Sequence, residues 1–125
     1  MKKPDHLAQR DSNDWVYEQL RQLRNQTTTS SQSDVLQQWM YILRFYATLH
    51  WGTAHLQKCS ITGTLTHQRR LKLLRQYWPN QRQARQAYNT LKNYSEQARY
   101  EGWVPSGCDL SDAQRLKTII EQGMR

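Results

Sequence analysis

The chain has 125 residues, two cysteines and a formal net charge of +8. This length predicts a single domain that buries its own hydrophobic core. The cysteines exclude a disulfide framework and a zinc site, because neither has a second cysteine or a paired histidine at metal-binding spacing. The apolar runs are too short to span a bilayer, and the N-terminal stretch lacks the apolar segment of a signal peptide. We therefore expect a cytoplasmic protein with free thiols and no membrane partner, metal or cofactor.

The positive charge is concentrated in the middle of the chain. Residues 35–95 contain nine lysines and arginines but no aspartate or glutamate. A basic surface without carboxylates attracts phosphate backbones, so this segment favours nucleic acid as a partner. It also excludes paired catalytic carboxylates and carboxylate metal cages within the segment. The alternative interpretation is a solvated basic face that binds nothing.

The composition predicts helices and no strand, since many Gln, Arg, Leu and Ala residues are combined with few glycines and prolines. A first helix is expected at about residues 13–25, with Asp11 or Ser12 as its cap. The polar stretch at residues 27–33 then predicts a loop.

A long second helix is expected from a cap at Ser33 or Asp34 to about Lys58. Apolar residues in this segment form two adjacent stripes at helical spacing, which makes the helix apolar around most of its girth. Such a helix lies at the centre of a bundle or packs one face against another protein.

Two further helices are expected after a loop at residues 60–65. Thr66 predicts the N-cap of the third helix, and Pro79 ends it. Asn80 is expected to cap a fourth helix that runs towards Tyr100. The spacing of small and apolar residues predicts its buried face: Ala84, Ala87, Tyr88, Leu91, Ser95 and Ala98.

A loop at residues 101–110 and a capping box of Ser111 with Gln114 predict a last helix that ends near Gly123. Together the elements predict an all-α fold, a single up-and-down helical bundle of four to five helices. We expect one domain over residues 1–125. It divides into an N-terminal helix and polar loop (1–33), a helical core (34–100), and a loop with the C-terminal helix (101–125).

The third and fourth helices carry most of the side chains that we expect to contact phosphate. The predicted nucleic-acid-binding residues are His67, Arg69, Arg70, Lys72, Arg75, Arg82, Arg85, Lys92 and Arg99. The tight turn at residues 78–80 leaves helix-turn-helix DNA binding as an alternative, with the start of the fourth helix reading bases. The length of that helix and its apolar side favour a bundle member over an exposed reader.

Three motifs, in sequence order, resemble those of the HEPN family. They are FYATLHW at residues 45–51, THQRR at residues 66–70, and AY at residues 87–88 with SEQARY at residues 95–100. The resemblance covers residues 34–100 and implies an up-and-down helical bundle, often a homodimer through its long helices. It also implies a toxin–antitoxin, phage-defence or CRISPR-linked system, with an antitoxin or an effector-complex protein as partner.

Active HEPN proteins share an Arg-x(4 to 6)-His signature that cleaves RNA without a metal, and here it matches Arg44 and His50. The resemblance implies that the histidine moves a proton at the ribose 2′-hydroxyl or the leaving oxygen, while the arginine neutralises charge on phosphorus. On a straight helix, however, six steps of about 100° leave the two side chains roughly 120° apart. Phe45 also replaces the usual polar residue after the arginine. Catalysis by this pair therefore requires a distorted helix or His50 of a second subunit.

His50 and His67 each have a structural and a functional interpretation. His50 lies in line with an apolar stripe, which is typical of a half-buried core histidine. His67 fits either the edge of the core or an anion site at a helix start. A pocket formed by His50, His67, Arg70 and Arg99 is a further hypothesis.

The remaining histidines and the cysteines carry no strong signal. We expect His6 and His55 at the surface. A metal site that combines Cys59 with His50 and His67 is disfavoured, because the spacings are irregular and no carboxylate is near in the sequence.

The sequence thus predicts a small RNA-binding, HEPN-like protein of a bacterial defence or toxin–antitoxin-type system, with metal-independent endoribonuclease activity as its enzymatic version. The alternative is a non-catalytic nucleic-acid-binding or scaffold subunit of a larger ribonucleoprotein, such as a CRISPR-type effector complex.

Overall fold

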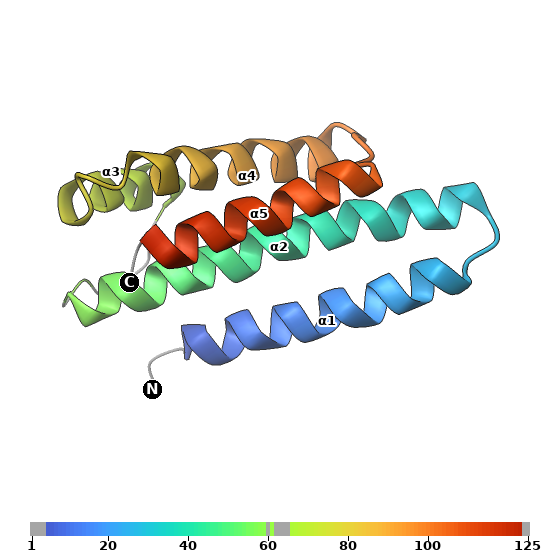
Figure 1. Ribbon diagram of the computed structural model, residues 1–125, viewed down its shortest axis with the longest axis horizontal. Helices are drawn as coiled ribbons and strands as arrows, with labels where there is room; N and C mark the ends of the chain where they lie inside the picture. The colour runs from blue at the N-terminus through green and yellow to red at the C-terminus, as the bar shows by residue number, and fades with distance from the viewer. Residues whose placement is uncertain (1–4, 60, 62–65, 124–125) are drawn as a thin grey trace.

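The computed structural model describes residues 5–59, 61 and 66–123, so most of the loop predicted at residues 60–65 lies outside the described residues. The described residues form five helices and no strand: α1 (His6–Gln26), α2 (Ser30–Lys58), α3 (His67–Tyr77), α4 (Arg82–Tyr100) and α5 (Gly107–Gly123). Figure 1 shows α1 and α2 as a long antiparallel hairpin, with α4 and α5 running along α2 and α3 beside the first part of α4. The predicted all-α helical bundle is confirmed.

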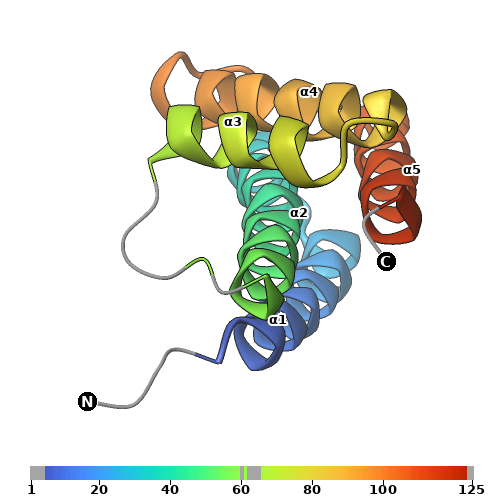
Figure 2. The same cartoon turned by 90° about the vertical axis from the view of Figure 1, so that its left-hand side faces the viewer.

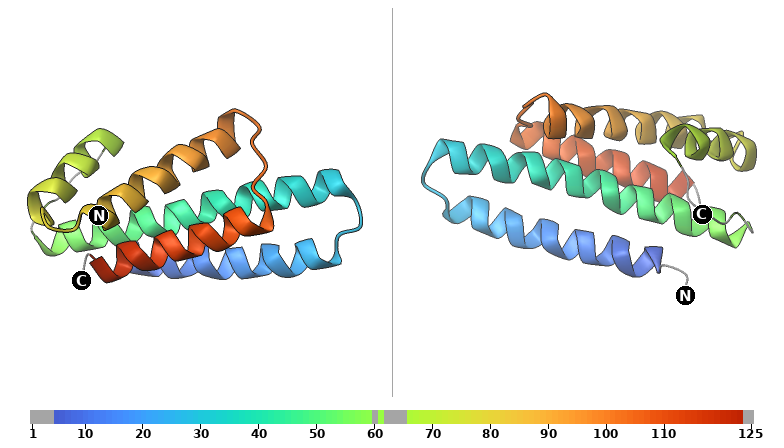
Figure 3. Two further views of the ribbon diagram at one scale, coloured as in Figure 1. Left: turned by 45° about the horizontal axis from the view of Figure 1, so that its top comes forward. Right: turned by 180° about the vertical axis from the view of Figure 1, so that it is seen from behind.

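Helix α2 lies at the centre of the bundle because it is apolar around most of its girth. Eleven of its residues are buried, all of them between Met40 and Leu56. It contacts each of the other four helices. In the end-on view of Figure 2, α1 lies on one side of α2 and the layer of α3 and α4 on the other. Two further views give the same arrangement (Figure 3).

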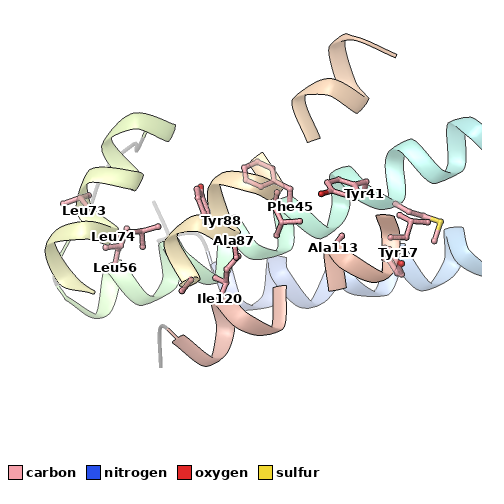
Figure 4. Packing of buried hydrophobic residues seen from close by; sticks show 14 residues of the cluster. Tyr17, Tyr41, Phe45, Leu56, Leu73, Leu74, Ala87, Tyr88, Ala113 and Ile120 are labelled. Carbon is pink, nitrogen blue, oxygen red and sulfur yellow. The ribbon is translucent and has the colours of Figure 1, made fainter. Parts of the chain in front are cut away.

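All five helices contribute to one hydrophobic core. Figure 4 shows Tyr17 of α1, Leu74 of α3 and Ile120 of α5 in the cluster that surrounds the buried residues of α2. Helix α4 buries every residue predicted for its inner face: Ala84, Ala87, Tyr88, Leu91, Ser95 and Ala98. Their spacing of three or four places them on one side of a helix, so the sequence alone specifies this face.

The first two helices begin earlier than the sequence predicts. Asp5 caps α1, because its carboxylate accepts a hydrogen bond from the Ala8 N–H at 3.0 Å. The cap predicted at Asp11 or Ser12 is therefore wrong. Only residues 27–29 separate α1 from α2, so the longer loop predicted there is wrong as well. The start of α2 is exposed, and its polar residues resemble a loop because they need no apolar neighbours.

The later helix starts are predicted with mixed success. Thr66 caps α3 as expected, with its hydroxyl accepting an N–H of the first turn at 3.1 Å. Helix α4 begins after Gln81 rather than Asn80. Helix α5 begins earlier than predicted, because Ser106 and Asp109 form the capping box: Ser106 N–H donates to the Asp109 carboxylate at 2.8 Å, and Asp109 N–H donates back to the Ser106 hydroxyl at 3.2 Å.

Leu91 tests the core directly. The Leu91 side chain of α4 is fully buried. Leu91→Ala should therefore lower the free energy of unfolding by about 2–5 kcal/mol, because apolar burial is lost and a cavity is left unfilled. Leu23, which is 51% exposed, is the matched control, and Leu23→Ala should change the free energy of unfolding by less than about 0.5 kcal/mol. Urea unfolding followed by circular dichroism measures both. Equal losses in the two variants would contradict the packing described.

Candidate nucleic-acid interface

A hollow of about 270 Å³ lies between α3 and α4, and none of its lining residues is acidic. Arginine supplies half of the lining, and the rest is one leucine and two amides. The lining residues are Leu71, Arg75, Arg82, Arg85, Gln86 and Asn89. The short turn after α3 brings the end of α3 beside the start of α4, and this folds the three arginines into one place.

The arginines of this hollow are not neutralised by carboxylates. Within the described residues, Arg75, Arg82 and Arg85 form no ion pair. Arg85 donates one hydrogen bond to the Pro79 carbonyl at 3.2 Å, while its Nε is buried without a hydrogen-bond partner in the described part of the chain. The α4 N-terminus adds positive potential, since Gln81 makes no side-chain capping bond and the first turn has no acid. Together they give this surface a positive potential.

The other predicted nucleic-acid-binding residues are distributed more widely. Arg69 and Lys72 are exposed on α3. Lys92 is paired with Glu96 at 3.3 Å, which neutralises part of the row predicted on α4. Arg99 donates a hydrogen bond to the Tyr46 hydroxyl at 2.5 Å and lies towards the far end of α4. The structure thus gathers Arg75, Arg82 and Arg85 but not the whole predicted set.

Arg70 lies in the core rather than on the basic surface. It is only 6% exposed, and its guanidinium joins three helices. It donates to the Thr53 hydroxyl at 3.3 Å and to the Tyr88 hydroxyl at 3.4 Å, and contacts the His67 Nδ1 at 3.3 Å. Its location therefore differs from the one expected for a phosphate-contacting arginine.

A histidine cluster surrounds Arg70. His6 Nδ1 lies 2.7 Å from His50 Nδ1 and the two rings stack, so the prediction that His6 is a surface residue is wrong. Burial lowers the pKa of His50 to about 4, with further contributions from His6 and Arg70. Burial and the charge of Arg70 also lower the pKa of His6, although Asp5 opposes the shift. Both imidazoles are neutral at pH 7 and accept protons poorly.

The pocket suggested by the sequence forms only in part. His67 contacts Arg70, and its pKa is lowered by burial and by the charges of Arg70 and Lys92, while Glu96 raises it. The charge of Arg70 also acts on His50. His50, His67 and Arg70 therefore lie in one region. Arg99 donates instead to the Tyr46 hydroxyl, one turn before His50 on α2, and no hydrogen bond joins Arg99 to either histidine within the described residues.

His55 is a second histidine whose predicted location is wrong. It is 8% exposed, and its Nδ1 lies 3.0 Å from the Trp51 carbonyl one turn earlier in α2. The sequence carries a weak signal for this burial, because His55 falls between the apolar residues Ala54 and Leu56.

Arg44 and His50 occupy separate surroundings. Helix α2 is continuous from Ser30 to Lys58, so no break in it rotates one side chain towards the other. Arg44 donates to the Asp14 carboxylate at 3.1 Å, and its guanidinium lies 3.5 Å from the centre of the Tyr17 ring. His50 instead packs against His6. No hydrogen bond or ring contact joins the two residues within the described chain.

Arg44 belongs to a network of ion pairs that connects α1, α2 and α5. Asp14 also pairs with Lys117 at 3.3 Å, and Lys117 pairs with Glu121 at 3.0 Å. Glu121 in turn pairs with Arg10 at 3.0 Å. No sequence pattern indicates this network, because its interhelical pairs join residues that are 30 or more positions apart.

The described residues contain no group of three or more histidine, cysteine or acidic side chains arranged to hold a metal ion. Cys59 and Cys108 are free thiols, as predicted. In the part of the chain that the structure describes, no helix combines the length and apolarity needed to cross a membrane.

Comparison with known proteins adds no assignment. The chain matches no protein-family model, and no curated protein and no solved structure is significantly similar to it.

The ion-pair network predicts a structural role for Arg44. Arg44→Ala removes a largely buried partner of Asp14 and should lower the free energy of unfolding by roughly 2 kcal/mol. The matched control is Arg21→Ala, whose pair with Glu18 is exposed and should contribute less than about 1 kcal/mol. Chemical unfolding measures both variants. An Arg44→Ala protein as stable as the parent would contradict a structural role.

The histidine pair predicts a loss of stability in acid. The pKa of His50 falls from 6.5 to about 4 on folding, and that of His6 is lowered too, so below pH 6.5 the unfolded chain binds more protons than the folded protein. The contribution of this pair to the free energy of unfolding should be at its maximum above pH 6.5 and should decrease as the pH falls towards 4. The double variant His6→Gln with His50→Gln should show a flatter decline of the urea midpoint over this range. Parallel declines in both proteins would exclude the pair as the cause.

Proposed function

We propose that this protein binds RNA through the basic surface of α3 and α4, with Arg75, Arg82 and Arg85 as the phosphate-contacting centre. The observation that carries the proposal is the hollow that these three arginines line without any acidic neighbour. A guanidinium group matches phosphate with two parallel hydrogen bonds, and three such groups around one hollow suit a polyanion better than a single charge.

The surroundings of the hollow support a nucleic-acid backbone as the anion. Arg69 and Lys72 extend the exposed basic surface along α3. Tyr77 is exposed at the end of α3, two residues after Arg75, and offers a ring on which an unpaired base can stack. Phosphate contacts beside an exposed ring are typical of single-stranded or looped RNA.

Duplex DNA is the less favoured ligand. In a helix-turn-helix protein the second helix enters the major groove with its side chains exposed. Helix α4 instead packs its apolar face, including Tyr88 and Leu91, against α2 and α5. Its first turn remains accessible for phosphate, but most of the helix is a member of the bundle.

We propose further that the protein is a non-catalytic member of the HEPN-like group that its motifs resemble, acting as an RNA-binding or scaffold subunit. Two observations favour this over the endoribonuclease. The Arg44 guanidinium is paired with Asp14 and packed on Tyr17. His50 contacts His6 and is neutral at pH 7, so it is not charged to act as the general acid for a leaving oxygen. The defence, toxin–antitoxin or effector-complex setting remains what the resemblance implies.

Charge reversal at the hollow tests the binding proposal. Arg82→Glu with Arg85→Glu should weaken binding of a labelled structured RNA roughly 10- to 100-fold at about 0.15 M salt, because two phosphate contacts become repulsive. The plot of log affinity against log salt should become shallower by about 2, because each phosphate that is no longer neutralised reduces the slope by about one unit. Fluorescence anisotropy over a salt series measures both quantities.

The control reverses the same amount of charge elsewhere. Arg21→Glu with Arg115→Glu alters exposed arginines of α1 and α5, outside the basic surface. It should reduce affinity far less than the α4 pair. If both double variants lose equal affinity, binding follows net charge alone and the hollow is not the site. If an equal length of duplex DNA competes as well as RNA, the preference for RNA is wrong.

Catalysis has a separate test. Structured RNA incubated with the protein in excess chelator should remain intact while still bound. Cleavage that leaves a 2′,3′-cyclic phosphate and disappears in His50→Ala would replace the non-catalytic proposal with a metal-independent endoribonuclease.

A further inference from the structure

A second hollow, of about 330 Å³, lies where the middle of α4, the loop after α4 and the first turns of α5 meet α2. Its chemistry is opposite to that of the arginine hollow. Aromatic rings and carboxylates dominate its lining in a protein whose net charge is +8. The lining includes Tyr41, Tyr94, Trp103, Asp109, Asp112 and Arg115.

Three aromatic rings from three segments form one side of this hollow. The Tyr94 and Trp103 ring centres are 5.0 Å apart, and Tyr41 meets Trp103 edge-on at 5.2 Å. Tyr94 is 41% exposed, so part of its surface is open to solvent. No arginine or lysine of the described chain lies over any of these three rings. The exposed part of the Tyr94 ring is therefore not covered by a cation of the described chain, and an outside cation can approach it.

The hydroxyl of Tyr41 supplies a polar group in the hollow. Tyr41 is 3% exposed and lines the hollow, and its hydroxyl makes no hydrogen bond to any residue that the structure describes. The hydroxyl is not one of the fully buried polar atoms without a partner, so the small exposed part of Tyr41 includes this oxygen. Burial raises the pKa of this phenol, and Tyr94, Asp109 and Asp112 raise it further, so its oxygen stays a neutral acceptor and donor.

Two carboxylates complete the set of acceptors. Asp109 is held in place because one of its oxygens, Oδ2, accepts both hydrogen bonds from Ser106. Asp112 has only a long contact of 3.7 Å to Arg115, and both of those side chains are more than 60% exposed. Such a loose surface pair is weak, so a competing cation can displace it.

We propose that this hollow binds a primary alkylammonium group, as carried by a lysine side chain or a polyamine. An ammonium has three N–H donors, which match the Tyr41 oxygen and the two carboxylates, while the rings attract its charge. The volume is about ten times that of one water molecule in the liquid, enough for the ammonium and its alkyl stem. The site goes beyond the proposed RNA binding, since it takes a ligand of the opposite charge in another part of the bundle.

Titration with butylammonium tests the site on the full chain. The probe should shift the indole N–H signal of Trp103 in a ¹⁵N-correlated NMR spectrum and saturate, whereas the neutral isostere 1-butanol should bind at least about tenfold more weakly, because it lacks the charge. Nα-acetyl-lysine methylamide and spermidine then distinguish the two sources of the ammonium. Tighter binding of either one than of butylammonium supports the proposal and identifies the source.

Two substitutions with matched controls localise the binding. Tyr94→Ala and Asp112→Asn should each weaken butylammonium binding several-fold, and neither side chain is buried or caps a helix. The controls Tyr77→Ala and Asp34→Asn change an exposed tyrosine and an exposed acid elsewhere and should leave it unchanged. Affinity for butanol or tetramethylammonium equal to that for butylammonium would overturn the proposal. Unchanged binding in both site variants would overturn it as well. RNA affinity should be unaffected by Tyr94→Ala, so this test fails or succeeds separately from the RNA proposal.

Discussion

Helix α2 must remove apolar surface from water on nearly all sides, and this requirement arranges the other helices. A helix with two adjacent apolar stripes cannot be satisfied by one neighbour, so α1 covers one side while α3, α4 and α5 cover the others. Those helices need only one buried face each, and α4 shows this most clearly. The outer faces are thereby left free to carry charge, and the residues that line the two hollows come mainly from the outer helices.

The distribution of charge follows from the same arrangement. Residues 35–95 contain no acidic residue, so a basic side chain there can form an ion pair only with a carboxylate from outside the segment. Arg44 pairs with Asp14 because α1 packs against that side of α2. Helices α3 and α4 lie on the opposite side, away from α1, and their arginines at the hollow stay without ion pairs in the described chain. A stretch of sequence without acidic residues thus has an ion-paired arginine on one side of α2 and, in the described chain, arginines without ion pairs on the other.

The histidines illustrate how far burial alters chemistry. His50 has the spacing to Arg44 of a nuclease signature, but the antiparallel hairpin of α1 and α2 stacks it on His6, which stands 44 residues earlier. Burial, and after it the neighbouring imidazole and guanidinium groups, lower the pKa of His50 by disfavouring its protonated form. A motif match in one helix therefore says little about proton transfer until the groups that pack against that helix are known.

The sequence specifies the helical class, the inner face of α4 and the Thr66 cap, because each depends on spacing or chemistry within a few residues. It leaves α2 either at the centre of the bundle or packed against another protein, and the contacts of α2 with all four other helices place it at the centre. The sequence also shows that the excess of positive charge lies in residues 35–95. Helix starts such as those at Asp5 and Ser106 were missed, since several polar residues in each loop had equal claim to the cap. Packing in three dimensions was needed to establish which arginines gather, that Arg70 and His55 are buried, and that one hollow combines the rings with two carboxylates. Most of those contacts join residues far apart in the chain. They depend on how the helices pack around α2, and the periodicity of a single segment does not encode that packing.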